Sequence, residues 1–173
     1  MTVLVTGFEP FDGESINPSQ CVAQAMRGRT LAGAQVFGEV LPCVFGKSAD
    51  RLGDAMTRLN PAVVICLGQA GGRPGVQLER VALNLADARI PDNEGNRPVS
   101  QGIEAAGPVA YWSGLPLVEM EKALSGAGLP VAFSLSAGAY VCNHLFYSLM
   151  HRRANLDLSS TLAGFVHLPW LPE

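Results

Sequence analysis

Apolar, β-branched runs alternate along the chain with stretches in which apolar residues recur every three or four positions. The runs are typical of buried strands, and the stretches are typical of helices with one apolar face. Regular alternation of the two favours an α/β protein whose strands are mostly parallel. The sequence therefore predicts a three-layer α/β/α sandwich with a largely parallel, mixed central sheet.

The strand signal is strongest at 62–67, an unbroken apolar run between Pro61 and Gly68. A run without polar alternation predicts a central strand that is buried on both faces. Shorter runs of the same kind predict strands at 3–6, 36–41, 131–135 and 162–166.

The first predicted helix has a clear start signal, with Asn17 as N-cap, Pro18 at N1 and Gln20 at N3. We expect it to end near residue 28. Its expected inward face consists of Cys21, Val22, Ala25 and Met26. A helix at 47–59 should turn Leu52, Ala55, Met56 and Leu59 inward. Further helices are predicted at 117–124 and 141–152.

Composition adds the expected size and location of the protein. A chain of 173 residues buries about two-thirds of its unfolded surface, so a core forms without disulfides or metals. We therefore expect one domain, residues 1–173. The cysteines at 21, 43, 66 and 142 have no CxxC spacing, which predicts free thiols in a reducing compartment. The amino terminus shows no signal-peptide pattern, so the expected location is cytoplasmic.

Charge and hydropathy argue against a nucleic-acid-binding protein and against a membrane protein. The formal net charge is -3, and no basic block with interleaved aromatics is present, which argues against nucleic acid. The longest apolar run, at 62–67, is far shorter than the roughly 20 residues that span a bilayer, which argues against a membrane protein.

A candidate nucleophile lies where small residues at 136–139 turn a predicted strand into a predicted helix. Cys142 would lie in the first turn of that helix. Free backbone N–H groups and the helix dipole favour a thiolate there, and the same N–H groups can receive a developing oxyanion. A free cysteine can equally be a small buried hydrophobic residue.

The histidines differ in their fitness as a base for Cys142. His144, at i+2 on a helix, is rotated by about 200° from Cys142, which indicates a structural role. His151 lies beside arginines near the helix end, where a charge would complement the dipole. His167 closes the last predicted strand at the carboxyl edge of the sheet and is the better candidate.

A Cys–His pair needs a third group to orient the imidazole. The charged stretch 79–97 offers several carboxylates, and its composition does not choose among Glu79, Asp87, Asp92 and Glu94. Two other patterns carry less weight. The glycine pair before Arg73 lacks a Walker lysine, and the Cys142, His144 and His167 set has poor spacing for zinc.

Several motifs occur together and in one order along nearly the whole chain. They are VTGFEPF at 5–11, INPS at 16–19, GQAGGR at 68–73, ERVA at 79–82, ADARIPDNEG at 86–95, VCNHL at 141–145 and HLP at 167–169. At these residues the sequence resembles the pyrrolidone-carboxylate peptidases, or pyroglutamyl peptidases I. These are cysteine peptidases that remove an N-terminal pyroglutamate.

The resemblance implies a catalytic role for Cys142 as nucleophile, for His167 as acid and base, and for Glu79 as the acidic third member. It implies that no metal or organic cofactor is required. It also implies a single catalytic domain that assembles into a homotetramer and acts on small pyroglutamyl peptides.

The resemblance further implies a pocket for the lactam ring, in which Phe8 and Phe11 pack against the ring. The remaining residues that it assigns to substrate binding are Gln69, Tyr140 and Val141 in the pocket wall, and Asn17 and Arg89 in a supporting polar network. Arg89 would lie near the oxyanion side of the site.

The chain departs from the family pattern at a few positions. Asp12 stands where glycine is common, Cys43 where threonine is usual and Tyr140 where phenylalanine is usual. Relatives also continue beyond the last residues into another helix, so we expect one face of the sheet to be less covered here. A runner-up function is a non-catalytic binder of pyroglutamyl-capped peptides. A phosphorylase-like transferase is a weaker alternative that rests on fold analogy and glycine-rich loops.

Overall fold

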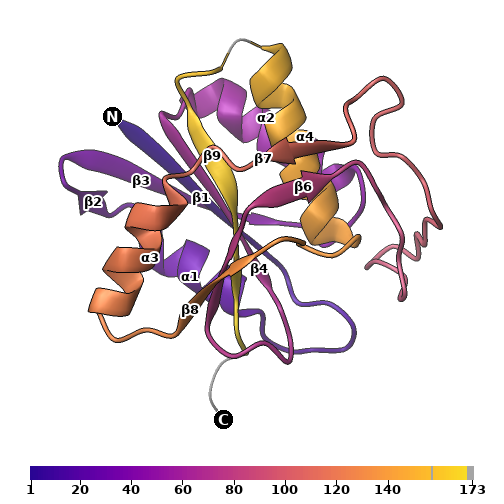
Figure 1. Ribbon diagram of the computed structural model, residues 1–173, viewed down its shortest axis with the longest axis horizontal. Coiled ribbons are helices and arrows are strands. Elements are labelled where there is room, and N and C mark those ends of the chain that lie inside the picture. The colour runs from indigo at the N-terminus through magenta and orange to yellow at the C-terminus, as the bar shows by residue number, and fades with distance from the viewer. Residues whose placement is uncertain (157, 171–173) are drawn as a thin grey trace.

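The computed structural model describes residues 1–156 and 158–170, so the predicted domain 1–173 reaches slightly beyond the described residues. Its main sheet has seven strands in the order β2-β3-β1-β4-β9-β5-β8 (Figure 1). The strands are β1 (Thr2–Phe8), β2 (Thr30–Leu31), β3 (Ala34–Leu41), β4 (Val63–Gln69), β5 (Val76–Glu79), β8 (Val131–Ser134) and β9 (Leu162–Leu168). β6 (Val81–Leu83) and β7 (Ala110–Trp112) form a separate antiparallel pair.

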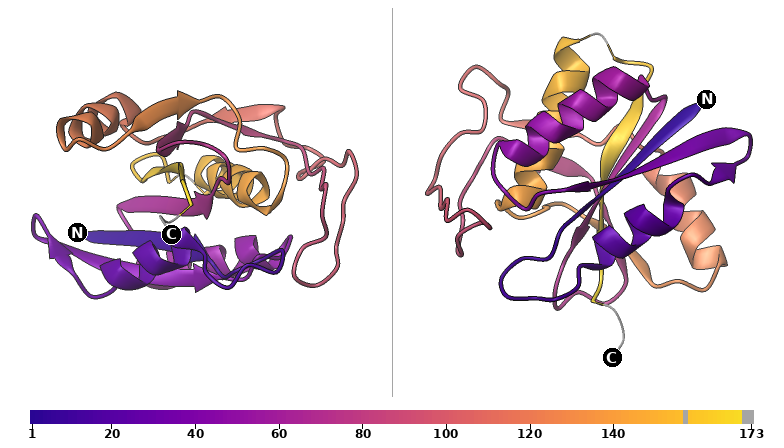
Figure 2. Two further views of the ribbon diagram at one scale, coloured as in Figure 1. Left: turned by 90° about the horizontal axis from the view of Figure 1, so that it is seen from below. Right: turned by 180° about the vertical axis from the view of Figure 1, so that it is seen from behind.

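The helices cover both faces of the sheet, as Figures 1 and 2 show. They are α1 (Pro18–Met26), α2 (Lys47–Leu59), α3 (Leu117–Gly126) and α4 (Val141–Asn155). α2 and α4 lie side by side over one face, and α1 and α3 lie on the other face. Alternate strand residues enter opposite cores: Leu4 packs with α2 and α4, whereas Val5 packs with α1. The predicted three-layer α/β/α sandwich is confirmed.

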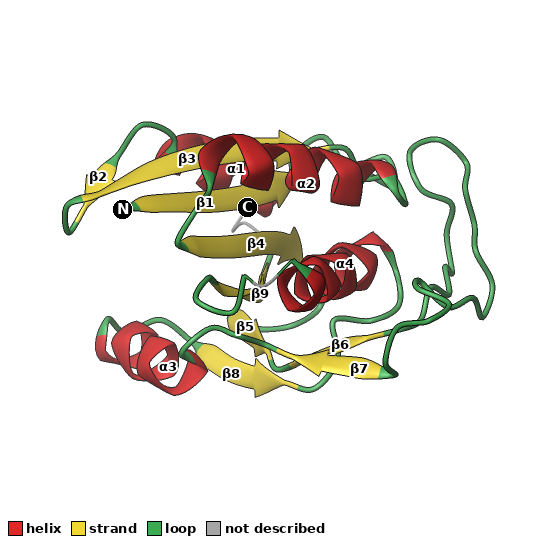
Figure 3. Cartoon of the chain, turned by 90° about the horizontal axis from the view of Figure 1, so that it is seen from above, coloured by secondary structure: helices red, strands yellow, loops and turns green. Residues whose placement is uncertain are grey.

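The sheet is mixed because of β5. β1 pairs in parallel with β3 and β4, and β4 pairs in parallel with β9. β5 is antiparallel to β9 but parallel to β8 (Figure 3). The sequence analysis did not predict β5, because Gln77 and Glu79 interrupt its apolar character. This strand brings Glu79 beside β9.

The predicted bounds of the other elements were close to the observed ones. The helix at 47–59 is confirmed without change as α2. The last strand is longer than predicted, so His167 lies inside β9 rather than at its end. The free state of the cysteines is also confirmed: Cys21 is exposed, and Cys43, Cys66 and Cys142 are buried.

The predicted inward face of α1 was wrong at three of its four residues. Met26 is partly buried and packs against the core on the α1 side of the sheet. Cys21, Val22 and Ala25 are exposed, and the buried residues are Pro18, Ser19 and Ala23. These small residues let the backbone of α1 lie directly on β1 and β3. A Cβ at Gly7 or Gly38 would overlap the carbonyl oxygens of Ser19 and Ala23, respectively. Close backbone approach, and not an apolar stripe, therefore decides how α1 packs.

The cap of α1 was predicted correctly. Asn17 is the N-cap, and its side chain accepts a hydrogen bond from the Ser19 amide at 3.0 Å. No helix in the described part of the chain combines the length and apolar character that a membrane span needs. Residues 1–156 and 158–170 also contain no cluster of three or more histidine, cysteine or acidic side chains suited to a metal ion.

Candidate active site

A buried histidine and a buried carboxylate meet at the junction of β9 and β5. His167 Nδ1 donates a hydrogen bond to Glu79 Oε1 at 2.8 Å, and the Glu79 side chain is 0% exposed. The antiparallel pairing of β5 with β9 places Gln77 opposite His167, two residues from Glu79. The bond fixes the ring orientation of His167 and leaves Nε2 free for another partner.

The other candidate carboxylates have different partners. Glu94 pairs with Lys47 at 2.6 Å on the surface. Asp87 accepts the Ser100 amide at 3.4 Å. Asp92 accepts the amides of Phe45, Glu94 and Asn96 at 2.9 Å each. Of the four carboxylates that composition left open, Glu79 is the one bound to a histidine.

Cys142 lies in the first turn of α4, on the same face of the sheet as His167. An added Cβ at Gly68 would lie 2.9 Å from Cys142 Sγ. Gly68 is the register partner of His167 in the β4–β9 ladder, so the thiol sits over the strand beside His167. Phe165 lies beside both residues: its ring centroid is 4.9 Å from that of His167, and it also meets the space above Gly68. The lack of a side chain at Gly68 makes room for the sulfur.

The amino terminus of α4 is uncapped by side chains. Its N-cap residue, Tyr140, makes no side-chain capping bond. The amides of the first turn of a helix have no intrahelical acceptor, so they remain donors for an anion near Cys142.

The expectation that this helix end makes Cys142 a ready thiolate is not met. Burial raises the pKa of the Cys142 thiol well above its ordinary value, and the nearby Cys43 and Glu79 raise it further. Removing a charged group from water costs more free energy than the helix terminus returns. The thiol form is therefore favoured, and ionisation requires that a base accept the proton.

An aromatic wall lies beside Cys142. The ring centroids of Phe11 and Phe45 lie 5.9 Å and 5.5 Å from that of Tyr140. Phe8 is fully buried in the core that also contains Cys142. Of the two phenylalanines assigned to the lactam ring by resemblance, Phe11 is partly exposed, whereas Phe8 is buried.

The hydroxyl of Tyr140 has partners that a phenylalanine would not need. It donates to the carbonyl of Pro91 at 3.0 Å and lies near the Cys43 thiol. Burial raises the pKa of Cys43 to about 12, and burial likewise raises the pKa of Tyr140. The two departures from the family pattern at 43 and 140 are therefore in contact with each other.

The segment 91–96 is fastened to the loops after β1 and β3. Asn93 donates to Glu9 Oε1 at 2.8 Å and to the Pro10 carbonyl at 3.0 Å. Burial opposes ionisation of Asp92, but hydrogen bonds from Asn96, Phe45 and Glu94 outweigh it and hold the Asp92 pKa below 3.8. These hydrogen bonds hold the segment 91–96 against the loops beside the aromatic wall.

The remaining residues named by resemblance differ in their surroundings. Gln69 ends β4, and its Oε1 is buried with no hydrogen-bond partner among residues 1–156 and 158–170. Val141 is buried, and Asn17 is buried while donating to the Glu9 carbonyl at 3.1 Å. Arg89 is exposed. Asp12 has φ of 55°, a left-handed conformation that glycine adopts easily.

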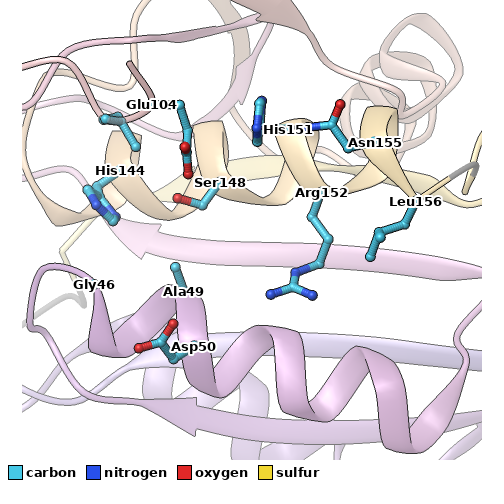
Figure 4. Close-up of a pocket in the computed structure, with 11 residues that line it drawn as sticks. Gly46, Ala49, Asp50, Glu104, His144, Ser148, His151, Arg152, Asn155 and Leu156 are labelled. Atoms are coloured by element: carbon cyan, nitrogen blue, oxygen red, sulfur yellow. Dashed lines mark hydrogen bonds between the residues drawn. The ribbon is translucent and has the colours of Figure 1, made fainter. Parts of the chain in front are cut away.

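The other two histidines lie away from the His167–Glu79 pair. His144 points into a pocket of about 410 Å³ between α2 and α4, together with Asp50 and Arg152 (Figure 4). Burial lowers the pKa of His144. His151 is hydrogen-bonded to Tyr111 and Asn155.

Sequence reasoning missed some residues at the site. Phe45 belongs to the aromatic wall, and its signal was the apolar LPCVF segment at 41–45. Arg73 was considered only as part of a phosphate loop, but its guanidinium lies 3.7 Å from Glu79 Oε1. Ser134 Oγ accepts a hydrogen bond from the same guanidinium at 3.0 Å. No local pattern marks Ser134, because its partner is distant in the sequence.

Comparison with known proteins gives consistent results. A family model described as pyroglutamyl peptidase matches residues 1–173. The chain is 49% identical over 172 residues to a pyrrolidone-carboxylate peptidase of Bacillus mycoides and 48% identical to one of Cupriavidus taiwanensis. In each case the match covers 99% of this chain and 80% of the relative.

Solved structures agree with the curated relatives. The pyroglutamyl peptidase I of Bacillus amyloliquefaciens superposes with a TM-score of 0.96 at 46% identity. A mutant pyrrolidone carboxyl peptidase of Pyrococcus furiosus also gives 0.96, at 43% identity. Both matches cover 99% of this chain and 82% of the solved chain.

Proposed function

The chain belongs to the pyroglutamyl peptidase family, and from that premise we propose that Cys142, His167 and Glu79 are its nucleophile, its acid–base and its orienting carboxylate. The protein is a cysteine-type peptidase that removes N-terminal pyroglutamate from peptides. The observation that carries the assignment of residues is the buried 2.8 Å bond between His167 and Glu79 on the sheet face that holds Cys142.

The first half of the reaction forms a thioester. His167 Nε2 accepts the proton of Cys142, and the sulfur attacks the carbonyl carbon that joins pyroglutamate to the next residue. The tetrahedral oxyanion is stabilised by the free amides at the start of α4. The protonated His167 then gives its proton to the leaving amine, the C–N bond breaks, and the shortened peptide departs.

The second half consumes water. His167, now neutral, accepts a proton from a water molecule that attacks the thioester carbonyl. The C–S bond breaks, the proton returns to Cys142, and free pyroglutamate leaves. Glu79 keeps the ring oriented through Nδ1 and stabilises its positive charge in both halves.

Recognition of the lactam is proposed to combine flat apolar contacts with a few hydrogen bonds. Pyroglutamate carries no free amine and no charge on its ring, so an aromatic wall with Phe11 and Tyr140 suits it. Gln69 Oε1, which has no hydrogen-bond partner in the described part of the chain, is an acceptor for the lactam N–H. Phe8, Val141, Asn17 and Arg89 complete the pocket as supporting residues.

We also propose that residues 1–173 act as a single catalytic domain in the cytoplasm, without a metal or organic cofactor, and assemble into a homotetramer. The mechanism above needs only side chains and water. The free, mostly buried cysteines fit a reducing compartment.

The direct test is hydrolysis of a pyroglutamyl-coumarylamide by the reduced protein. Parallel samples would be the same protein alkylated with iodoacetamide and the Cys142→Ala variant. We expect fluorophore release from the untreated protein alone. Full activity of Cys142→Ala, with circular dichroism matching the parent, would overturn the assignment of the nucleophile.

A further inference from the structure

Arg73 lies in the loop between β4 and β5, at the rim of the His167–Glu79 pair. Its guanidinium Nη1 is 3.7 Å from Glu79 Oε1, the same oxygen that binds His167. The Arg73 side chain is 44% exposed, whereas Glu79 is fully buried. A partly exposed cation and the buried imidazole therefore share one carboxylate oxygen.

Glu79 needs such a neighbour for a physical reason. Burying an ionised carboxylate costs free energy unless it is paired and hydrogen-bonded. Glu79 Oε1 is bonded to His167, but Oε2 is buried and has no hydrogen-bond partner within the described ranges. When His167 is neutral during deacylation, Arg73 is the positive charge that remains beside the carboxylate.

A second contact holds Arg73 in place. Nη1 donates to Ser134 Oγ at 3.0 Å, and Ser134 is the register partner of Glu79 in the β5–β8 ladder. The same hydroxyl accepts the Ser136 amide and donates to the Ser136 carbonyl. Ser134 and Ser136 begin the segment that leads into α4 and Cys142. Arg73 thus links the carboxylate to the chain that presents the nucleophile.

We propose that Arg73 is a positioning residue for the peptidase reaction, which holds the Glu79 carboxylate aligned with His167 while anchored on Ser134. The proposal rests on the catalytic roles proposed above for Cys142, His167 and Glu79. Arg73 does not touch the reacting atoms and acts through Glu79.

The charge of Arg73 has a consequence for pH dependence. Glu79 is faced by His167 from β9, by Arg73 from the β4–β5 loop and by Cys142 from α4. Glu79 is one of the groups that raise the pKa of the Cys142 thiol, and a positive charge beside Glu79 offsets this effect. Removing this charge should move the whole pH profile of kcat/KM to higher pH. A residue that only stabilised the loop would leave the profile in place.

The experiment compares Arg73→Gln, Arg73→Lys and Ser134→Ala with the parent, using the pyroglutamyl-coumarylamide assay across pH. Arg80→Gln is the matched control, because Arg80 follows Glu79 directly but stacks on the Phe133 ring, 4.1 Å from its centroid. For Arg73→Gln we expect kcat to fall roughly three- to tenfold with KM changed less than about twofold, since the ion pair is partly exposed. Arg73→Lys should restore the pH profile, and Ser134→Ala should show a smaller loss of kcat.

Several results would overturn the proposal. These are an unchanged kcat and pH profile for Arg73→Gln, a loss confined to KM, or an equal loss for Arg80→Gln. If circular dichroism shows that Arg73→Gln does not fold, Arg73→Lys and Ser134→Ala test the proposal instead. Parent-like kcat and pH profile of Ser134→Ala would then contradict the proposed role of Arg73. Cys142→Ala in the same series separates the proposed positioning role of Arg73 from the proposed catalytic role of Cys142. Residual activity of this variant contradicts the assignment of Cys142 as nucleophile and leaves the role of Arg73 untouched.

Discussion

At the scale of single residues, Cys142 combines a reactive position with a burial that opposes its ionisation. The start of α4 offers free amides, yet desolvation raises the pKa of the thiol well above its ordinary value. In the mechanism proposed above, the thiolate forms when His167 accepts the proton, and the bond to Glu79 favours that transfer.

The raised pKa predicts the pH dependence of alkylation at Cys142. Because the thiol loses its proton only as pH approaches a raised pKa, the rate with iodoacetamide should climb steadily between about pH 6 and pH 9. Peptide mapping by mass spectrometry measures Cys142 separately from the exposed Cys21, which serves as an internal reference. A rate at Cys142 that is high and flat over this range would show a preformed thiolate and contradict the prediction.

The Glu79–His167 bond predicts that replacing one carboxylate oxygen of Glu79 with nitrogen strongly lowers kcat. Glu79→Gln keeps the shape of the side chain but removes the charge that stabilises the imidazolium. We expect kcat to fall by roughly 10²- to 10⁴-fold while KM changes little. The control is Glu94→Gln, which breaks only the surface ion pair with Lys47 and should retain parent activity. Similar losses in both variants would indicate that the effect is not specific to the pair.

At the scale of elements, backbone contact between α1 and the sheet holds β1 in place behind the site. Gly7 and Gly38 have no room for a side chain, because the carbonyls of Ser19 and Ala23 lie against them. β1 carries Phe8, and the loop after it carries Phe11 and Asn17. The packing of α1 thus sets the positions of Phe8 and Phe11.

This contact makes the Gly38→Ala variant less stable. The added methyl group must displace α1, which should lower the free energy of unfolding by about 1–3 kcal/mol. Gly126→Ala is the control, because a Cβ there meets nothing within 4 Å at the end of α3. It should leave stability unchanged or raise it by roughly 0.5–1 kcal/mol. Urea unfolding followed by circular dichroism measures both, and equal midpoints for the two variants would refute the packing argument.

At the scale of the whole molecule, the site is assembled from segments far apart in the sequence. Glu79 and His167 are separated by 88 positions, yet they share a 2.8 Å bond. The β4–β9 ladder, the β5–β9 ladder and α4 must all form before the three proposed catalytic side chains meet.

Outside the site, large apolar side chains remain exposed, including Val109 at 84% and Trp112 at 73%. Such surface fits contacts between subunits.

The proposed homotetramer has a simple mass test. Size-exclusion chromatography with light scattering should give four times the 18.2 kDa of one chain. The same mass measurement on a variant with serine at Val109 and Trp112 tests whether the exposed surface at β7 takes part in contacts between subunits. A monomeric mass for the parent over a wide concentration range would contradict the tetramer.

The sequence by itself determined the α/β alternation, most element bounds and the candidate nucleophile and base. Hydrophobic periodicity and caps are local properties, so 47–59 was found as a helix and 62–67 as a central strand. Composition left Glu79, Asp87, Asp92 and Glu94 equivalent, and the family resemblance singled out Glu79. The tertiary structure gives the physical reason, because the pairing of β5 with β9 brings this carboxylate to His167. It also decided the buried face of α1 and the contact of Arg73 with Glu79. Such contacts depend on which backbones approach each other across the sheet, and no local pattern of residues encodes that.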